Sequence, residues 1–88
     1  MPRETYHPNA RVALVRNTKR GLKARSSILT KLQKSSGEAT SIAREVGLSY
    51  GSVMHHLKLL LAESIVTREG RRPYMWTVSG LGQKRLLN

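Results

Sequence analysis

The sequence has no cysteine, few acidic side chains and no long apolar run. Without cysteine it offers no disulfide, no thiolate ligand for a metal ion and no cysteine nucleophile. Its 5 acidic residues are scattered, and no serine has a partner base at a telling spacing, so no catalytic constellation is present. No apolar run approaches the ~20 residues of a membrane helix. We therefore expect a soluble, cytoplasmic protein that is not an enzyme and uses no cofactor or metal.

The charge is strongly positive and unevenly distributed. The 88 residues carry 16 lysines and arginines and a net charge of +11, in a chain long enough for one small domain. Residues 1–25 contribute +6, residues 26–64 only +1 and residues 65–88 the other +4. Such ends attract a polyanion, because each phosphate contact releases counterions. Nucleic acid is the expected partner, and a merely solubilising charge, a ribosomal protein or a membrane-surface protein are the alternatives.

Two short helices joined by a tight turn are predicted in the near-neutral centre. Apolar residues recur at helical spacing over 39–46 and again over 49–63. Gly47 supplies a left-handed residue between them, and Ser49 is a natural N-cap for the second helix. This pattern is typical of a helix-turn-helix. The face of the second helix turned to the core is expected to hold Val53, Leu57, Leu60 and Ser64.

The flanking segments complete one domain over residues 22–88. Helical spacing predicts a first helix over 22–35. A change to alternation predicts a β-hairpin with strands at 65–68 and 74–78 and a basic turn between them. Tyr74 and Trp76 of its second strand alternate with Met75 and Thr77, which favours packing of the two aromatic side chains on the helices over stacking on bases. Ser79 is expected to cap a last short helix over 80–87.

Residues 1–21 are predicted to form a basic arm or a short extra element. The apolar stretch within 10–15 fits a helix or a strand equally well. The segment resembles an arm lying along phosphates or in a minor groove, while a disordered tail or a dimerisation element are the alternatives. We expect most of the affinity for nucleic acid to come from residues 11–25 and 68–72.

The order of these elements and the amino-acid sequence of the central segment resemble those of a known family. The order α-α-α-β-β-α, mainly α with a small β-hairpin, is that of a winged helix. The runs Val46-Gly47-Leu48-Ser49 and His55-His56-Leu57-Lys58 resemble ArsR-type winged helix-turn-helix repressors, over about residues 22–87. The resemblance implies DNA binding and a homodimer. Metal sensing of the family's cysteine type is not implied, and Ser64 stands where the family tends to have glycine.

Residues for contact with DNA follow from the faces of the second helix. At ~100° per residue, a small, polar and basic strip points away from the core, whereas His56 borders the core and is expected to be structural. The predicted base-reading residues are Tyr50, Gly51, Ser52 and His55. The predicted backbone contacts are Ser49, Lys58, Arg68, Arg71, Arg72, Arg16, Lys19, Arg20 and Lys23.

The sequence thus predicts a double-stranded DNA-binding transcriptional regulator of the nucleoid. Helix 49–63 would enter the major groove, and the wing at 68–73 and the basic arm would contact the backbone or the minor groove. Three consecutive leucines at 59–61 cannot all be buried by one helix face, so some of them are expected to cover the hairpin, the last helix or another subunit, and the last of these would be a homodimer. The alternative is a structural or docking winged helix on RNA, ribosomal or other, or in a polymerase or replication assembly.

Overall fold

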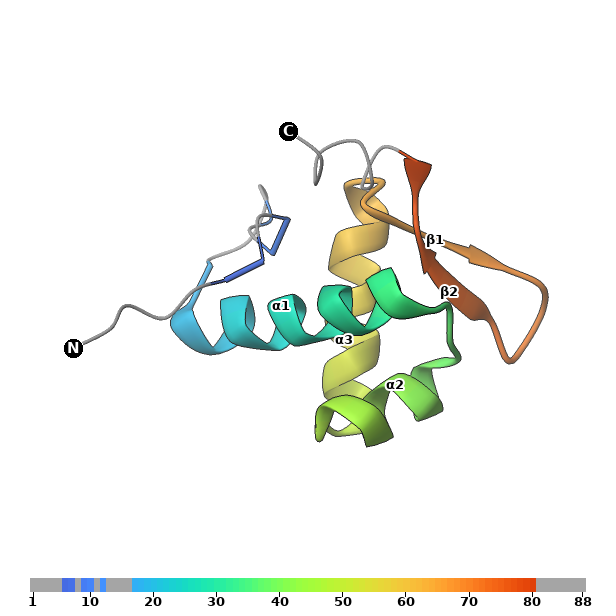
Figure 1. Ribbon diagram of the computed structural model, residues 1–88, viewed down its shortest axis with the longest axis horizontal. Helices are drawn as coiled ribbons and strands as arrows, with labels where there is room; N and C mark the ends of the chain where they lie inside the picture. The colour runs from blue at the N-terminus through green and yellow to red at the C-terminus, as the bar shows by residue number, and fades with distance from the viewer. Residues whose placement is uncertain (1–5, 8, 11, 13–16, 81–88) are drawn as a thin grey trace.

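The first helix, α1, spans Lys19–Lys34 in the computed structural model, which describes residues 6–7, 9–10, 12 and 17–80 (Figure 1). Thr18 is its N-cap, and the threonine hydroxyl accepts the N–H of Gly21 at 3.0 Å. This bond satisfies one of the N–H groups that a first helical turn leaves without a partner. The helix begins earlier than the predicted residue 22 because of this cap. Lys19 and Arg20, expected in the arm, therefore form the first turn of α1.

The predicted helix-turn-helix is present as α2 (Ala39–Val46) and α3 (Tyr50–Ala62). Gly47 ends α2 with φ at 71°, a left-handed conformation that glycine adopts without a steric cost. Ser49 caps α3, because its hydroxyl accepts the N–H of Ser52 at 3.1 Å. The sequence predicts both the turn glycine, Gly47, and the cap serine, Ser49. Together these two residues determine where α3 begins.

Ser64 lies just beyond the end of α3 in a left-handed conformation, with φ at 60°. This conformation is unfavourable for a residue with a side chain, whereas glycine would adopt it without a steric cost. The hydroxyl of Ser79 donates to the carbonyl of Ser64 and, at 3.1 Å, to that of Ile65, and these bonds hold the turn. The prediction that Ser64 faces the core is wrong, because α3 ends before it and its side chain is exposed.

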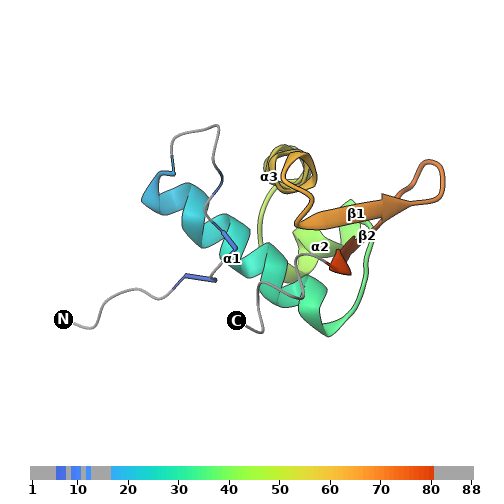
Figure 2. The same cartoon turned by 90° about the horizontal axis from the view of Figure 1, so that it is seen from above.

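The hairpin consists of β1 (Val66–Glu69) and β2 (Met75–Val78), and it projects away from the helices (Figure 2). The strands are antiparallel, with Arg68 opposite Trp76. Gly37 adds a one-residue bridge to the other edge of β2, since its N–H donates to the carbonyl of Trp76 at 3.1 Å and its carbonyl accepts the N–H of Trp76 at 2.8 Å. The predicted hairpin is confirmed. The predicted last helix over 80–87 lies outside the described residues, except for Gly80.

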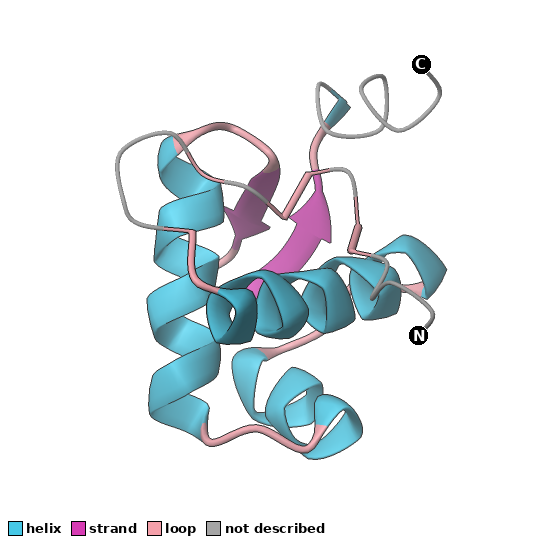
Figure 3. Ribbon diagram, turned by 90° about the vertical axis from the view of Figure 1, so that its left-hand side faces the viewer, coloured by secondary structure: helices cyan, strands magenta, loops and turns pink. Residues whose placement is uncertain are grey.

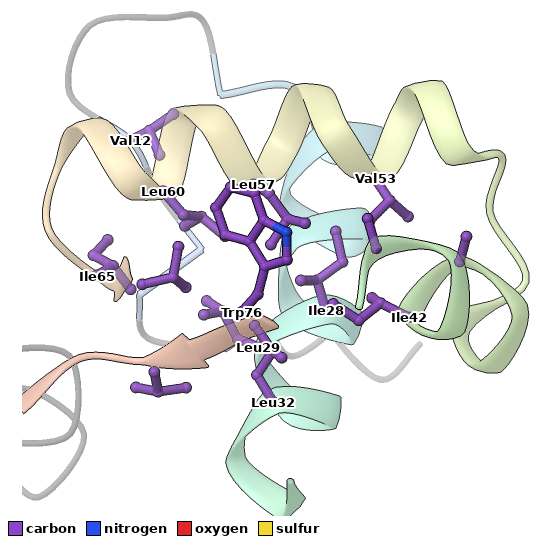
Figure 4. Close-up of a cluster of buried hydrophobic side chains, with 14 residues drawn as sticks. Val12, Ile28, Leu29, Leu32, Ile42, Val53, Leu57, Leu60, Ile65 and Trp76 are labelled. Atoms are coloured by element: carbon purple, nitrogen blue, oxygen red, sulfur yellow. The ribbon is translucent and has the colours of Figure 1, made fainter. Parts of the chain in front are cut away.

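The hydrophobic core lies where α1 meets α2, α3 and β2 (Figure 3). The indole of Trp76 is 1% exposed and points between α1 and α3 (Figure 4). Val12 closes the same core near Leu60. Tyr74 packs partly against it, so the predicted inward face of the second strand is confirmed. Other fully buried apolar side chains come from α1, α2 and α3, from β1 and from the residue just before it: Ile28, Leu29, Ile42, Val53, Leu57, Ile65 and Val66.

The leucine run at the end of α3 packs largely within this chain. Leu60 is fully buried, and Leu59 and Leu61 on either side are partly buried against the same core. Because the three leucines do not need a second subunit to cover them, they no longer argue for a homodimer. The homodimer stays a prediction from the family resemblance.

Part of the N-terminal segment is tied to the helices through Arg25 of α1. The backbone at Ala10 and Val12 is close to the core, with both residues buried. The Arg25 guanidinium, 2% exposed, donates to the carbonyl of Ala10 and to Oδ1 of Asn17, and its Nη1 lies 3.2 Å from Nδ1 of His56. Arg25 is therefore not available to phosphates, contrary to the expectation for residues 11–25. Arg16 lies outside the described residues, as do residues 13–15.

Candidate nucleic-acid interface

The outward face of α3 is small, polar and basic, as the sequence predicts. Gly51, His55 and Lys58 are exposed, while Val53 and Leu57 on the opposite face are buried. A Cβ atom added at Gly51 would meet no atom within 4 Å. We call Gly51 and His55 the crest of α3. At Gly51 a ligand can approach the helix backbone more closely than at a residue with a side chain.

A groove runs between α3 and the hairpin, and we call it the wing groove. Aromatic side chains are part of its lining, which contains three cations, Lys58, Arg68 and Arg72, against one carboxylate, Glu38. Such a groove suits the backbone of a nucleic acid, because its cations can contact the anionic phosphates. Its other lining residues are Ala39, Thr40, Tyr50, Met54, Pro73, Tyr74 and Trp76.

A second groove lies on the other side of α3, against the first half of α1, and we call it the α1 groove. It contains two cations, Arg20 and Lys23, and none of the described residues that line it is acidic. The hydroxyl groups of Thr18, Ser49 and Ser52 supply further hydrogen-bond donors, whereas the hydroxyl of Ser27, which also lines the groove, donates to the carbonyl of Lys23 at 3.2 Å. The two grooves share no lining residue. The crest of α3 therefore stands between two separate basic grooves.

The structure divides the predicted contact residues among these places. Tyr50 and Lys58 line the wing groove and Ser49 and Ser52 the α1 groove, while His55 lies on the crest. The remaining predicted cations lie as follows: Arg20 and Lys23 in the α1 groove, Arg68 and Arg72 in the wing groove, Arg71 exposed at the wing tip, and Lys19 exposed but in neither groove.

Sequence reasoning did not single out Thr18 and Ser27, which line the α1 groove. The capping rule offered a signal for Thr18, since a threonine stands directly before a helical pattern. No sequence signal was available for Ser27, because its place depends on how α1 packs beside α3. The orientation of Arg68 was also missed, since the sequence places it near the wing tip rather than inside a groove.

His56 has the structural role that the sequence predicts. It is 8% exposed, and burial, with the nearby Arg25 and His55 adding to it, lowers the pKa of His56 from 6.5 to about 4. The neutral ring accepts a hydrogen bond from Arg25 at Nδ1, because a guanidinium only donates. Since Arg25 also contacts the N-terminal segment, His56 joins α3 to α1 and to Ala10 through one buried network.

Over residues 6–7, 9–10, 12 and 17–80, no three side chains of the types that ligate metals come together. No helix in the same part of the chain is long and apolar enough to cross a membrane.

Helices α1 to α3, the wing and an outward helix face between two basic grooves define a winged helix-turn-helix domain of the DNA-binding class. The chain belongs to the arsR family of regulatory proteins, because the family described as "Bacterial regulatory protein, arsR family" matches residues 23–68. The match extends from α1 through the whole of α2 and α3 into β1. The resemblance to ArsR-type proteins is thereby confirmed.

A solved structure similar to this chain is the Zalpha domain of PKZ from Carassius auratus, determined in complex with Z-DNA. The two are 28% identical, with a TM-score of 0.57, and the alignment covers 59% of this chain and 86% of the other. The similarity confirms the winged-helix fold. No curated protein matches the sequence.

Proposed function

We propose that the chain regulates transcription by binding double-stranded DNA, with α3 in the major groove and the wing and α1 grooves on the two flanking backbones. The observation that supports this function best is the crest of α3 between two basic grooves. A major groove about 12 Å wide admits one helix and has a phosphate backbone along each side. One groove of the protein is then available to each backbone, while His55 on the crest and Ser52 beside it can meet base edges.

The roles of base reading and backbone contact can be separated by titration of labelled duplexes, followed by fluorescence anisotropy at several salt concentrations. Replacing Arg71 and Arg72 with glutamine should weaken binding to all sequences alike and reduce the slope of log K against log salt by about 2. Replacing Ser52 or His55 with alanine should instead change the preference among sequences, at a cost of about 1–3 kcal/mol for the preferred one. If neither pair of changes alters duplex binding, the proposed function is wrong.

Gly51 offers a variant in which stability and binding should change in opposite directions. Gly51→Ala should stabilise the fold by about 0.5–1 kcal/mol, because alanine favours a helix and the new methyl group meets no atom of the protein. The same methyl group would stand on the crest and should weaken duplex binding by about tenfold, or 1.4 kcal/mol. Thermal unfolding and anisotropy measure the two effects. A more stable variant with unchanged affinity would show that DNA does not approach the backbone at Gly51.

A second candidate function is recognition of duplex shape rather than sequence. The 28% identity to a domain solved with Z-DNA favours it. Its test adds three probes to the same titrations: an alternating CG duplex held in the left-handed form, the same duplex in the right-handed form, and an RNA duplex. Preference for the right-handed DNA supports the first function, preference for the left-handed form supports shape recognition, and preference for RNA supports the alternative of an RNA-docking winged helix.

A further inference from the structure

Arg68 lies on the inward face of the wing and not on its outer surface. In an antiparallel pair, residues directly opposite each other point to the same side of the sheet. Arg68 is opposite Trp76, which is buried against the helices, so the Arg68 side chain leaves β1 toward α3. Its neighbour Glu69 is opposite Met75 and faces outward. The Arg68 charge is therefore separated from that of Glu69 by the sheet itself.

Two aromatic rings hold the guanidinium of Arg68 inside the wing groove. Its Cζ atom is 4.4 Å from the centre of the Tyr74 ring and 5.7 Å from that of Trp76. The rings support each other edge to face, with centres 6.4 Å apart, and Trp76 is anchored in the core. A cation over an aromatic face is attracted by the negative charge of that face. Tyr74 thus restricts a side chain that would otherwise sample many rotamers.

The stacked guanidinium still has hydrogen bonds to offer. Stacking uses the flat face of the group, whereas its five N–H donors lie in the plane and point outward from its edges. Arg68 is exposed, and among residues 17–80 no acidic side chain forms an ion pair with it. Lys58 and Arg72 line the same groove, so the local potential favours an anion despite Glu38 at its edge. The N–H donors of Arg68 therefore point outward from the stacked group, at a place where the proposed function puts a phosphate.

We propose that Tyr74 is a positioning residue, which holds the Arg68 guanidinium in the wing groove for contact with a backbone phosphate of the nucleic acid. The inference rests on the proposed function and adds to it a residue that itself need not touch DNA. Ordering the arginine before binding removes part of the entropy that a free side chain loses when it forms a bidentate contact. Tyr74 should therefore act on affinity only through Arg68.

A double-mutant cycle tests this dependence by anisotropy titration of a duplex with the full chain. Arg68→Ala should weaken binding about tenfold and reduce the slope of log K against log salt by about 1. Tyr74→Leu should weaken binding by about two- to fivefold and leave the slope unchanged, because the charge stays in place. Tyr74→Phe should bind like the wild type, since it keeps the aromatic face. In the Arg68→Ala background, Tyr74→Leu should have no further effect.

Two control variants separate positioning from general effects on fold or charge. Met75→Leu changes the neighbouring, outward-facing residue of the same strand, and Arg44→Ala removes a charge that lines neither groove; both should bind like the wild type. Thermal unfolding sets a temperature at which every variant is folded. Equal losses from Tyr74→Leu with and without Arg68, or Tyr74→Phe binding as weakly as Tyr74→Leu, would overturn the inference.

The outcomes also distinguish this inference from the proposed function. If the wild type binds duplex DNA and Ser52→Ala changes its sequence preference, but Arg68→Ala and Tyr74→Leu leave affinity unchanged, the inference fails and the function stands. If the wild type binds no duplex, both fail. If Arg68→Ala lowers the unfolding temperature without any effect on binding, Arg68 only covers the aromatic side chains and the inference is again overturned.

Discussion

Replacing Arg20, Lys23, Lys58 and Arg68 together with glutamine should weaken duplex binding about a thousandfold at 0.15 M salt. Each phosphate that a protein neutralises releases ~0.9 counterions from B-DNA, which corresponds to about a fivefold gain in affinity at that salt concentration. Four lost contacts multiply to the expected effect and should reduce the slope of log K against log salt by about 3.6. Because these side chains are charged groups in surface grooves, the fold should remain close to the wild type in stability.

The same experiment can be divided to ask whether both sides of α3 hold DNA. The pair Arg20 and Lys23 belongs to the α1 groove and the pair Lys58 and Arg68 to the wing groove, with no lining residue in common. Replacing either pair with glutamine should therefore weaken duplex binding about thirtyfold and reduce the slope of log K against log salt by about 1.8. The two losses of affinity should multiply when both pairs are replaced. Lys34 and Arg44 line neither groove, so replacing both with glutamine is the matched control.

Two results would contradict an arrangement in which each groove binds one backbone of the duplex. If one pair accounts for the whole loss and the other for none, DNA contacts only one side of α3. If the Lys34 and Arg44 control loses as much as either groove pair, the affinity depends on net charge and not on the grooves. In both cases the salt slope identifies how many contacts are lost, independently of the absolute affinity.

The helix-turn-helix could be predicted from the sequence because its signals are local. Gly47 and Ser49 stand within a few residues of the helices that they end or begin, and their effect depends on backbone geometry alone. Trp76 was placed correctly for a similar reason, since alternation along a strand decides which residues share a face. These local rules were sufficient for the order of the described elements and for the outward face of α3.

Contacts between segments that are distant in the sequence could not be predicted from such local signals. Arg25 looks from the sequence like one more cation of a basic segment, yet the fold buries it beside His56 and the carbonyl of Ala10. Arg68 was expected at the wing tip, but the strand register turns it inward, to the face that carries Trp76. A charge pattern counts cations without showing which of them remain accessible, and that depends on packing between elements far apart in the chain.

Lowering the pH from about 6.5 to about 4 should destabilise the fold by up to about 3 kcal/mol through His56 alone. Burial lowers the pKa of His56 in the folded chain to about 4, whereas it is 6.5 in the unfolded chain. Between these values the unfolded chain binds the extra proton, so the stability contributed by neutral His56 is present above pH 6.5 and is lost as the pH falls. Protonation would also place a second charge against Arg25 and end the hydrogen bond that Nδ1 accepts.

The measurement is urea unfolding of the wild type and of His56→Asn at several pH values from 7 to 4. Asparagine presents an amide oxygen to Arg25 but does not titrate, so it keeps an acceptor and removes the proton. Burial lowers the pKa of His7 as well, but this contribution is common to the two curves. The wild type should therefore lose stability faster than His56→Asn as the pH falls. Parallel curves would mean that His56 is protonated in the folded chain as readily as in the unfolded one, and that its bond to Arg25 does not keep it neutral.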